Sequence, residues 1–261
     1  MRLERIPLEV PTRAPGGRTA AHVVGVEDAL LVDPAVADER LEATLERVGH
    51  VAVTHHHPDH VGRVAACAER ADAAVWCRYG RAAAFADAAG LEPDRTFREG
   101  TTIPVGDGTV TVRETPGHAV EHVAFELDDG IVTGDLAVAE GSVVVGAPEG
   151  DMRAYLTSLR RIYAMDPSRL FPAHGPVIDE PRKTCERLIR HRLDRERRVL
   201  AAVEAGNRTV ADVLDAAYEK DLEGVRDLAG RTVRAHLDKL CHEGQVRWDG
   251  ARAASAEPRQ S

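Results

Sequence analysis

The sequence predicts an α/β domain over residues 1–180, a small and mostly helical domain over residues 181–250, and a disordered tail over residues 251–261. Three observations carry this prediction. Short apolar runs alternate with amphipathic stretches in the first region, a continuous helical pattern opens the second, and the last residues are small and polar. Two strand-rich halves with helices on the outside favour a four-layer αββα sandwich for the first domain.

The first half of this domain alternates predicted strands with predicted helices. Apolar runs predict strands at 22–26, 29–34, 51–54 and 73–77, and helical periodicity predicts helices at 37–48, 61–71 and 80–90. This alternation is typical of an α/β fold.

The pattern changes after Gly90. Residues 101–115 and 122–135 each resemble two strands joined by a turn that contains glycine. A helix at 151–164 and a strand at 168–173 then repeat the earlier order of elements. The domain therefore has a second strand-rich half.

Pro181 opens a different region. The sequence predicts one long helix at 181–206, with proline in its first turn and glycine past its end. Two further helices follow at 209–220, with Thr209 as N-cap, and at 230–244, and a short strand follows at 245–248. Three helices and a hairpin, in this order, are typical of a winged helix.

Composition limits the function classes. The net charge is −9, made up of −12 over residues 1–180 and +3 over residues 181–261, so the first domain is a poor steering surface for a polyanion. No apolar run reaches the roughly 18 residues that span a bilayer, and no signal peptide is recognisable. The four cysteines form no C-x-x-C pair. We expect a cytoplasmic protein without a membrane partner.

Polar side chains follow four of the predicted strands, where α/β folds place their active sites. These residues are His55, His57, Asp59 and His60 after the strand at 51–54, then His118, Asp135 and His174. Imidazole and carboxylate suit zinc and related divalent ions such as manganese or iron. His55 and His57 could chelate one ion while Asp59 and His60 face a second, and Gly62 allows a close backbone approach. His56 points elsewhere, and His122 could hold a ligand by a hydrogen bond.

The motifs THHHPDH (54–60), TPGH (115–118), TGD (133–135) and PAHGP (172–176), in this order, resemble the metallo-β-lactamase superfamily, in its hydrolase branches with an aspartate between two metals. The resemblance implies the αββα sandwich and two bound ions, zinc or another divalent transition metal. It implies His55, His57 and His118 as ligands of the first ion and Asp59, His60 and His174 as ligands of the second. Asp135 would bridge the ions, and Asp33 would support a metal ligand without binding an ion itself.

Longer stretches, among them PGHAVEHVAFEL, GDLAVAEGSVVV and VRAHLDKLCHEG, resemble the lactamase-beta-like subfamily, whose best-known animal member is a single-strand endoribonuclease. This resemblance implies a C-terminal winged-helix-like domain and single-stranded RNA as substrate. Two departures from this subfamily bear on different predictions: the first removes the mitochondrial placement of the animal proteins, and the second leaves RNA cleavage resting on resemblance alone. No transit peptide precedes the first strand, and the loop VVGAPEG (144–150) has no aromatic residue that could stack on a base.

The site predicts hydrolysis by a hydroxide that bridges two metals, with Asp59 and Asp135 as the catalytic carboxylates. Single-stranded RNA is the favoured substrate by resemblance. A small thioester or ester, as for hydroxyacylglutathione hydrolase, is the alternative, and a non-catalytic metal-sensing winged-helix regulator is the second alternative. Arginines 187, 190, 195 and 198 form either a phosphate-binding stripe or a solvated face. The natural substrate, the metal, the oligomeric state and the role of the C-terminal domain stay open.

Overall fold

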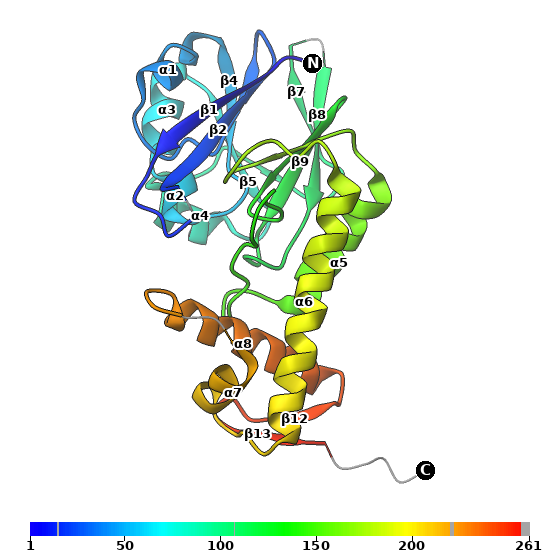
Figure 1. Cartoon of the computed structure of the whole chain (residues 1–261). Coiled ribbons are helices and arrows are strands. Elements are labelled where there is room, and N and C mark those ends of the chain that lie inside the picture. The colour runs from blue at the N-terminus through cyan, green and yellow to red at the C-terminus, as the bar shows by residue number, and fades with distance from the viewer. Residues whose placement is uncertain (15, 107, 220–221, 257–261) are drawn as a thin grey trace. The chain divides into compact units, whose positions relative to one another are not determined.

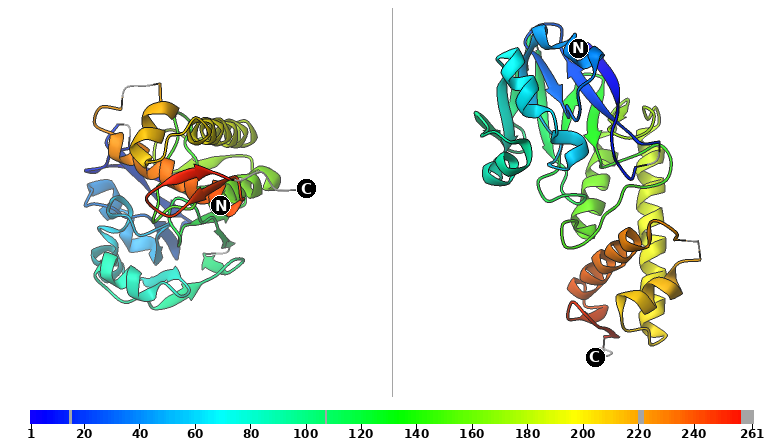
Figure 2. Two further views of the ribbon diagram at one scale, coloured as in Figure 1. Left: turned by 90° about the horizontal axis from the view of Figure 1, so that it is seen from below. Right: turned by 90° about the vertical axis from the view of Figure 1, so that its left-hand side faces the viewer.

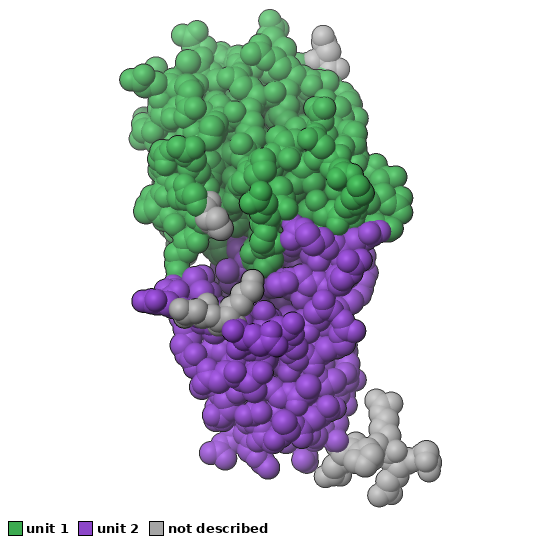
Figure 3. Space-filling model, in the orientation of Figure 1, with its two compact units in different colours: residues 1–115, 121–143, 162–184 green, residues 116–120, 144–161, 185–261 purple. Residues whose placement is uncertain are grey.

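The computed structural model describes residues 1–14, 16–106, 108–219 and 222–256. The chain divides into two compact units, which Figure 3 shows in different colours. Unit 1 contains residues 1–115, 121–143 and 162–184, and unit 2 contains residues 116–120, 144–161 and 185–261.

Unit 1 contains a six-stranded sheet whose strands follow one another in chain order (Figure 1). The strands are β1 (Leu3–Glu9), β2 (Arg18–Val24), β3 (Ala29–Val32), β4 (Val48–Ala52), β5 (Ala74–Arg78) and β6 (Arg95–Phe97). Strands β1 to β3 pair antiparallel, and β3 to β6 pair parallel. The parallel connections contain α1 (Glu39–Glu42), a 3-10 turn (Leu45–Arg47), α2 (Pro58–Val61), α3 (Val64–Ala71) and α4 (Ala82–Ala89). Parallel neighbours bring the ends of β3 and β4 to one edge of the sheet.

A second, five-stranded sheet completes the layers of unit 1. Its strands are β7 (Thr102–Val105), β8 (Gly108–Glu114), β9 (Val123–Leu127), β10 (Gly130–Gly134) and β11 (Leu170–Pro172), in the order β11-β10-β9-β8-β7. Only the β10–β11 pair among these described strands is parallel, and α5 (Met152–Met165) lies between those two strands in the chain. The ends of β10 and β11 therefore also lie at one edge.

Two apolar clusters hold these layers together. One contains Val23, Leu31 and Val51 of the first sheet with Leu41, Cys67 and Phe85 of the helices. The other contains Leu30 and Val32 of the first sheet with Val112, Phe125 and Val132 of the second. Alternate residues of the buried strands thus enter different clusters, because side chains alternate between the faces of a sheet. The expected α/β sandwich is confirmed, and its sheets lie face to face in Figure 2.

The C-terminal part of unit 2 is the expected winged helix. It is made of α6 (Pro181–Glu204, from Cys185 onward), α7 (Val210–Ala217), α8 (Arg226–His242) and the hairpin of β12 (Val246–Trp248) with β13 (Ala253–Ser255). Thr209 caps α7, as expected, in a capping box with Asp212. Its core takes Val199 from α6, Leu214 from α7, and Leu237 from α8.

Several elements differ from the sequence prediction. Strands β1 and β6 were not expected; β1 contains Pro7, which an edge strand tolerates because its N–H side is not needed for pairing. The helix expected at 37–48 is reduced to α1 and a 3-10 turn. The helix expected at 61–71 is split into α2 and α3 on either side of Gly62.

The C-terminal region differs as well. The helix expected from residue 230 begins at Arg226. The tail expected to be disordered over 251–261 contains β13, because Ala253 is buried in the winged-helix core and pairs with Trp248. Residues 257–261 of that tail lie outside the described residues. No helix in the described part of the chain is long and apolar enough to cross a membrane. The domain bounds 1–180 and 181–250 stay a prediction.

Candidate metal centre

The segment after β4 turns sharply into α2. His57 is the N-cap residue of this helix by position, and Pro58 occupies the first turn, where a missing N–H is tolerated. A Cβ atom at Gly62 would lie 2.5 Å from the carbonyl oxygen of Ala35 and 3.2 Å from that of Pro58. Because both contacts are with backbone, only glycine permits this approach. Glycine at this position therefore allows α2 to present Asp59 and His60 at the end of the strand.

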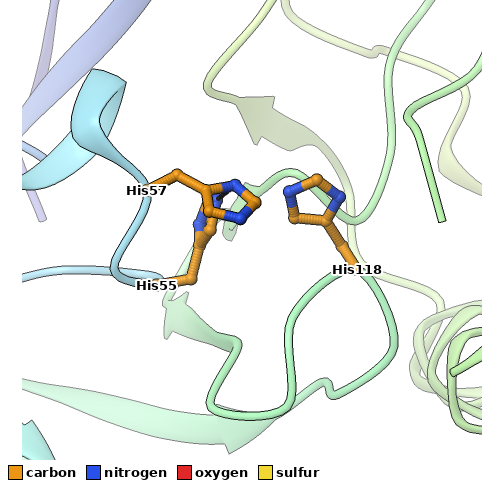
Figure 4. A group of neighbouring side chains, drawn as sticks. All are labelled: His55, His57 and His118. Carbon is orange, nitrogen blue, oxygen red and sulfur yellow. Dashed lines mark hydrogen bonds between the residues drawn. The ribbon is translucent and has the colours of Figure 1, made fainter. Parts of the chain in front are cut away.

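Three groups of side chains have ligand atoms that lie within 4.8 Å of one another. Together these groups contain every residue that the sequence predicts as a metal ligand: His55, His57 and His118; His55, His60 and Asp135; Asp59, His60 and His174. Figure 4 shows the rings of the first group directed toward one another. The shared members, His55 and His60, connect the groups into one cluster.

His60 carries the clearest sign that a cation fits this cluster. Its ring is fully buried, and its Nδ1 atom lies 2.9 Å from Oδ2 of Asp33. Its Nε2 atom has no hydrogen-bond partner among the described residues. The nearest carboxylate oxygens, Oδ1 of Asp135 and Oδ1 of Asp59, lie 3.8 Å and 3.9 Å from this Nε2. Those distances exceed a hydrogen bond and suit groups that share an ion.

Two further histidines are held in the same way by backbone carbonyls. The Nδ1 atom of His174 lies 2.6 Å from the carbonyl oxygen of Arg18, and Nδ1 of His118 lies 2.6 Å from that of Val144. A carbonyl only accepts, so in the neutral form of each ring Nδ1 carries the proton and Nε2 presents its lone pair. Metal-bound histidines normally have their second ring nitrogen fixed in this manner.

Asp33 fixes the neighbouring strand end. Its carboxylate is fully buried and accepts from the backbone N–H of Thr54 at 2.7 Å, from the Thr54 hydroxyl at 2.8 Å, and from His60 Nδ1 at 2.9 Å. The Thr54 hydroxyl in turn lies 3.1 Å from Nδ1 of His55. A single carboxylate therefore orients one predicted ligand, His60, directly and another, His55, through Thr54, whose role the sequence did not indicate.

His122 supports the loop of Asp135. Its Nδ1 lies 2.9 Å from the hydroxyl of Thr115, and its Nε2 accepts the backbone N–H of Asp135 at 3.1 Å. The ring is fully buried. The spacing from His118 suggested a supporting hydrogen bond to a ligand, and the structure places that bond at Asp135. A Cβ at Gly134 would lie 2.9 Å from this Nε2, so glycine keeps the contact open.

His56 lies between two predicted ligands in the sequence, but its side chain packs elsewhere, as expected. Its backbone N–H donates to Oε1 of Glu121 at 3.2 Å, and its ring meets that of Phe85 edge-on with centroids 5.5 Å apart. Burial lowers the pKa of this imidazole. A neutral ring against Phe85 is consistent with a role in packing the loop.

The carboxylates make the site strongly attractive to positive charge. Burial disfavours the charged form of His60, yet Asp33, Asp135 and Asp59 together raise the pKa of its imidazole to about 9. Burial also opposes the charged form of His174, whose pKa is raised by its contact with Asp135, where Nε2 and Oδ1 are 3.3 Å apart. The same oxygens that stabilise a proton there would stabilise a divalent cation.

Comparison with known proteins agrees with this geometry. The model of the metallo-beta-lactamase superfamily matches residues 14–174, and that of the beta-lactamase associated winged helix domain matches residues 209–254. The chain is 33% identical over 210 residues to a beta-lactamase-like protein 2 homolog of Drosophila melanogaster, covering 76% of this chain and 70% of that protein.

Several relatives have names that state an activity, and two of them illustrate the range. A hydroxyacylglutathione hydrolase of Cereibacter sphaeroides is 36% identical over 174 residues, covering 63% of this chain and 65% of that protein. An atrochrysone carboxyl ACP thioesterase of Aspergillus fumigatus is 28% identical over 225 residues, covering 78% of this chain and 66% of that protein.

Solved structures share the fold. A beta-lactamase domain protein from Burkholderia ambifaria superposes with a TM-score of 0.83 at 22% identity, covering 97% of this chain and 91% of that one. The di-iron-bound form of TTHA1623 has a TM-score of 0.51 at 28% identity, covering 67% of this chain and 94% of that one. The chain therefore belongs to the metallo-beta-lactamase superfamily of metal-dependent hydrolases and carries the winged helix domain associated with it.

Proposed function

We propose that the protein is a hydrolase that binds two divalent metal ions and cleaves a small acyl thioester or a related ester. His55, His57 and His118 would hold the first ion, and Asp59, His60 and His174 the second. Asp135 would be shared, because it is grouped with both His55 and His60. The observation that carries this proposal is the buried Nε2 of His60, which faces two carboxylates without a hydrogen-bond partner among the described residues.

The donor set suits zinc, manganese or iron, and zinc is our first expectation. Two such ions, when bound, supply Lewis acidity and lower the pKa of a shared water to about 7. The chain's own part is to hold the ligands and to accept protons. Asp59 is 17% exposed at its side chain, with Oδ2 3.6 Å from Nε2 of His174. We assign Asp59 the orientation of the attacking water and the acceptance of its proton, and Asp135 the spacing of the ligand groups.

Three observations favour a thioester or ester over RNA. Relatives are named hydroxyacylglutathione hydrolase and atrochrysone carboxyl ACP thioesterase, names that describe hydrolysis of thioesters. The alignment with the thioesterase covers 78% of this chain and so extends beyond residues 14–174, which match the superfamily model. The net charge of −12 over residues 1–180 disfavours the approach of a polyanion. Arg195, a member of the arginine stripe on α6, is engaged inside unit 2, where it donates to the carbonyl of Ala217 at 2.7 Å and stacks on Tyr218 at 3.4 Å.

Single-stranded RNA is the second candidate substrate. The match to the winged helix domain favours it, because such domains often contact nucleic acid. Arg198 and Arg190 are exposed and would have to carry phosphate contacts without Arg195. A metal-sensing regulator is less favoured, because a sensor would not need the complete set of ligands that this cluster contains.

One experiment compares the two substrates. Zinc-loaded protein is given an S-acyl glutathione, an S-acyl pantetheine and an end-labelled unstructured RNA, with Asp135→Ala as the inactive variant and Asp129→Ala, exposed near the same strand, as the matched control. We expect thiol release by the wild type and by Asp129→Ala, and none by Asp135→Ala. RNA cleavage with this same dependence, and no thiol release, would make RNA the substrate. Full activity in protein with no bound metal would refute the proposal for either substrate.

A further inference from the structure

The ring of His118 depends on a loop that belongs to unit 2. Residues 116–120, which contain His118, and residues 144–150 both lie in that unit, together with α8. The 2.6 Å contact between His118 Nδ1 and the carbonyl oxygen of Val144 sets the ring's tautomer and direction. The position of Val144 therefore controls where the Nε2 lone pair of His118 points.

The loop at residues 144–150 is hydrogen-bonded to Arg231 of helix α8 in the winged helix. The backbone N–H of Ala147 donates to the carbonyl oxygen of Arg231 at 3.1 Å. The side chain of Arg231 returns the contact, with Nε 3.4 Å from the carbonyl oxygen of Ala147 and a guanidinium nitrogen 3.7 Å from a carboxylate oxygen of Glu149. Arg231 thus contacts the loop at Ala147, three residues after Val144, whose carbonyl oxygen accepts the hydrogen bond from His118.

Three glycines let the backbone segments between α8 and His118 pack closely, so that a shift at one segment displaces the next. A Cβ at Gly146 would lie 2.9 Å from the Cβ of Arg231. A Cβ at Gly150 would lie 2.7 Å from the backbone nitrogen of Gly146 and 3.0 Å from the carbonyl oxygen of Gly117. A Cβ at Gly117, the residue before His118, would lie 2.3 Å from the Cα of Tyr155. Backbone therefore packs directly on backbone along the path from α8 to His118, with little room to adjust.

Helix α8, where this series of contacts begins, is held firmly by the core of the winged helix. Helix α8 places Val233, Leu237 and Leu240 in the core of the winged helix, where each is fully buried. His60 and His174, by contrast, are held by Asp33 and Arg18, all within unit 1. A change at Arg231 should thus act on one ligand of the first ion and leave the ligands of the second ion in place.

We propose that Arg231 and the loop at 144–147 are positioning elements for His118, so that the winged helix is a structural part of the first metal site. This inference rests on the proposed role of His118 as a metal ligand. It assigns the C-terminal domain a function that needs no contact with a substrate.

The test is a double-mutant cycle with zinc affinity as the readout. Gly146 lies outside the left-handed backbone region, so alanine is permitted there except for the contact with Arg231 Cβ. We expect Gly146→Ala to bind one zinc ion with the wild-type affinity and the other at least about 10-fold more weakly. Arg231→Gly removes the obstructing Cβ together with the guanidinium contacts, so Gly146→Ala/Arg231→Gly should bind the weakened ion more tightly than Gly146→Ala and as tightly as Arg231→Gly alone. Arg234→Gly, at an exposed arginine of the same helix, should give no recovery.

The outcomes separate the two proposals. A wild-type protein that binds fewer than two ions would refute the proposed function. A wild type with two ions, together with a Gly146→Ala variant that binds both with unchanged affinity or loses both equally, would refute the positioning role alone. If Gly146→Ala does not fold, as judged by circular dichroism, Arg231→Ala replaces it and should weaken one ion and spare the other. Equal binding of both ions by Arg231→Ala would then overturn the inference.

Discussion

Replacing Asp33 by asparagine should place the proton of His60 on the wrong nitrogen. The carboxylate accepts three hydrogen bonds, from the N–H and hydroxyl of Thr54 and from Nδ1 of His60. An asparagine oxygen can continue to accept from the Thr54 N–H, but its NH₂ group then faces the hydroxyl and Nδ1. Two donors cannot face one another, so Nδ1 must give up its proton, and the neutral imidazole of the variant carries its proton on Nε2. That nitrogen is the one directed at Asp59 and Asp135.

The magnitude follows from these contacts. Hydrogen bonds to a charged acceptor contribute about 1.5–3 kcal/mol each, and two of the three lose that acceptor, so we expect the metal-free protein to lose about 3 kcal/mol of unfolding free energy. Metal binding must also reverse the tautomer, and loss of such a supporting partner weakens metal affinity by about 10- to 100-fold. The weakened ion should be the one held by His60.

Zinc titration with a competing chelator measures the two affinities, and thermal unfolding of the metal-free protein measures stability. Asp128→Asn, at a residue whose side chain is 74% exposed, is the matched control. An Asp33→Asn protein that binds two zinc ions as tightly as the wild type would show that Asp33 does not govern the tautomer of His60.

Three further predictions test other parts of the molecule. His55→Ala should abolish hydrolysis and reduce the zinc content measured by mass spectrometry, while the circular dichroism spectrum stays close to that of the wild type; an active His55→Ala protein would contradict its role as a ligand. Glu196→Gln should destabilise the protein by about 3 kcal/mol near neutral pH, because Lys239 at 2.6 Å and His236 at 3.3 Å lose a buried anionic partner. Burial opposes the charged form of Glu196, but these partners lower its pKa, so its contribution is present above the unfolded pKa and is lost as the pH falls through the folded value. Unfolding free energies of wild type and Glu196→Gln should therefore converge in acid, and a constant difference would contradict this reasoning. Gly230→Ala lies inside α8, where the atom nearest to a new Cβ is 3.8 Å away, so it should raise the free energy of unfolding by up to about 1 kcal/mol. Chemical denaturation measures this change, and a value no higher than that of the wild type would contradict the prediction.

The cluster of candidate metal ligands could be predicted because its members are side chains of distinctive chemistry near the ends of apolar strands. His55, His57 and His60 follow β4 directly, and Asp135 and His174 follow the parallel pair β10 and β11. Parallel pairing brings the ends of β10 and β11 together, so strand order and residue type predict Asp135 and His174 as neighbours. The first sheet contributes the histidines after β4 because the two sheets pack against each other.

Short or interrupted elements were harder to predict. Strands β6 and β13 contain three residues each, too few to show an alternating pattern. Each strand forms because it pairs with a neighbour, β6 with β5 and β13 with β12. The break between α2 and α3 comes from a 2.5 Å approach to the Ala35 carbonyl, which helical periodicity does not contain. The arginine stripe on α6 is a prediction from helical spacing alone. Spacing does not show that Arg195 stacks on Tyr218 and is therefore engaged in an internal contact.

The support of the ligands is the least predictable part of the site, because much of it comes from backbone. Every residue has a carbonyl, so nothing in the sequence distinguishes Arg18, which holds His174 from 156 residues away, or Val144, which holds His118. The position of each carbonyl is decided by packing around it, and for Val144 that packing includes Gly146 and α8. Substitutions that alter no chemical group of the site should therefore change its metal affinity. In this protein such positions extend from the strand ends into the winged helix.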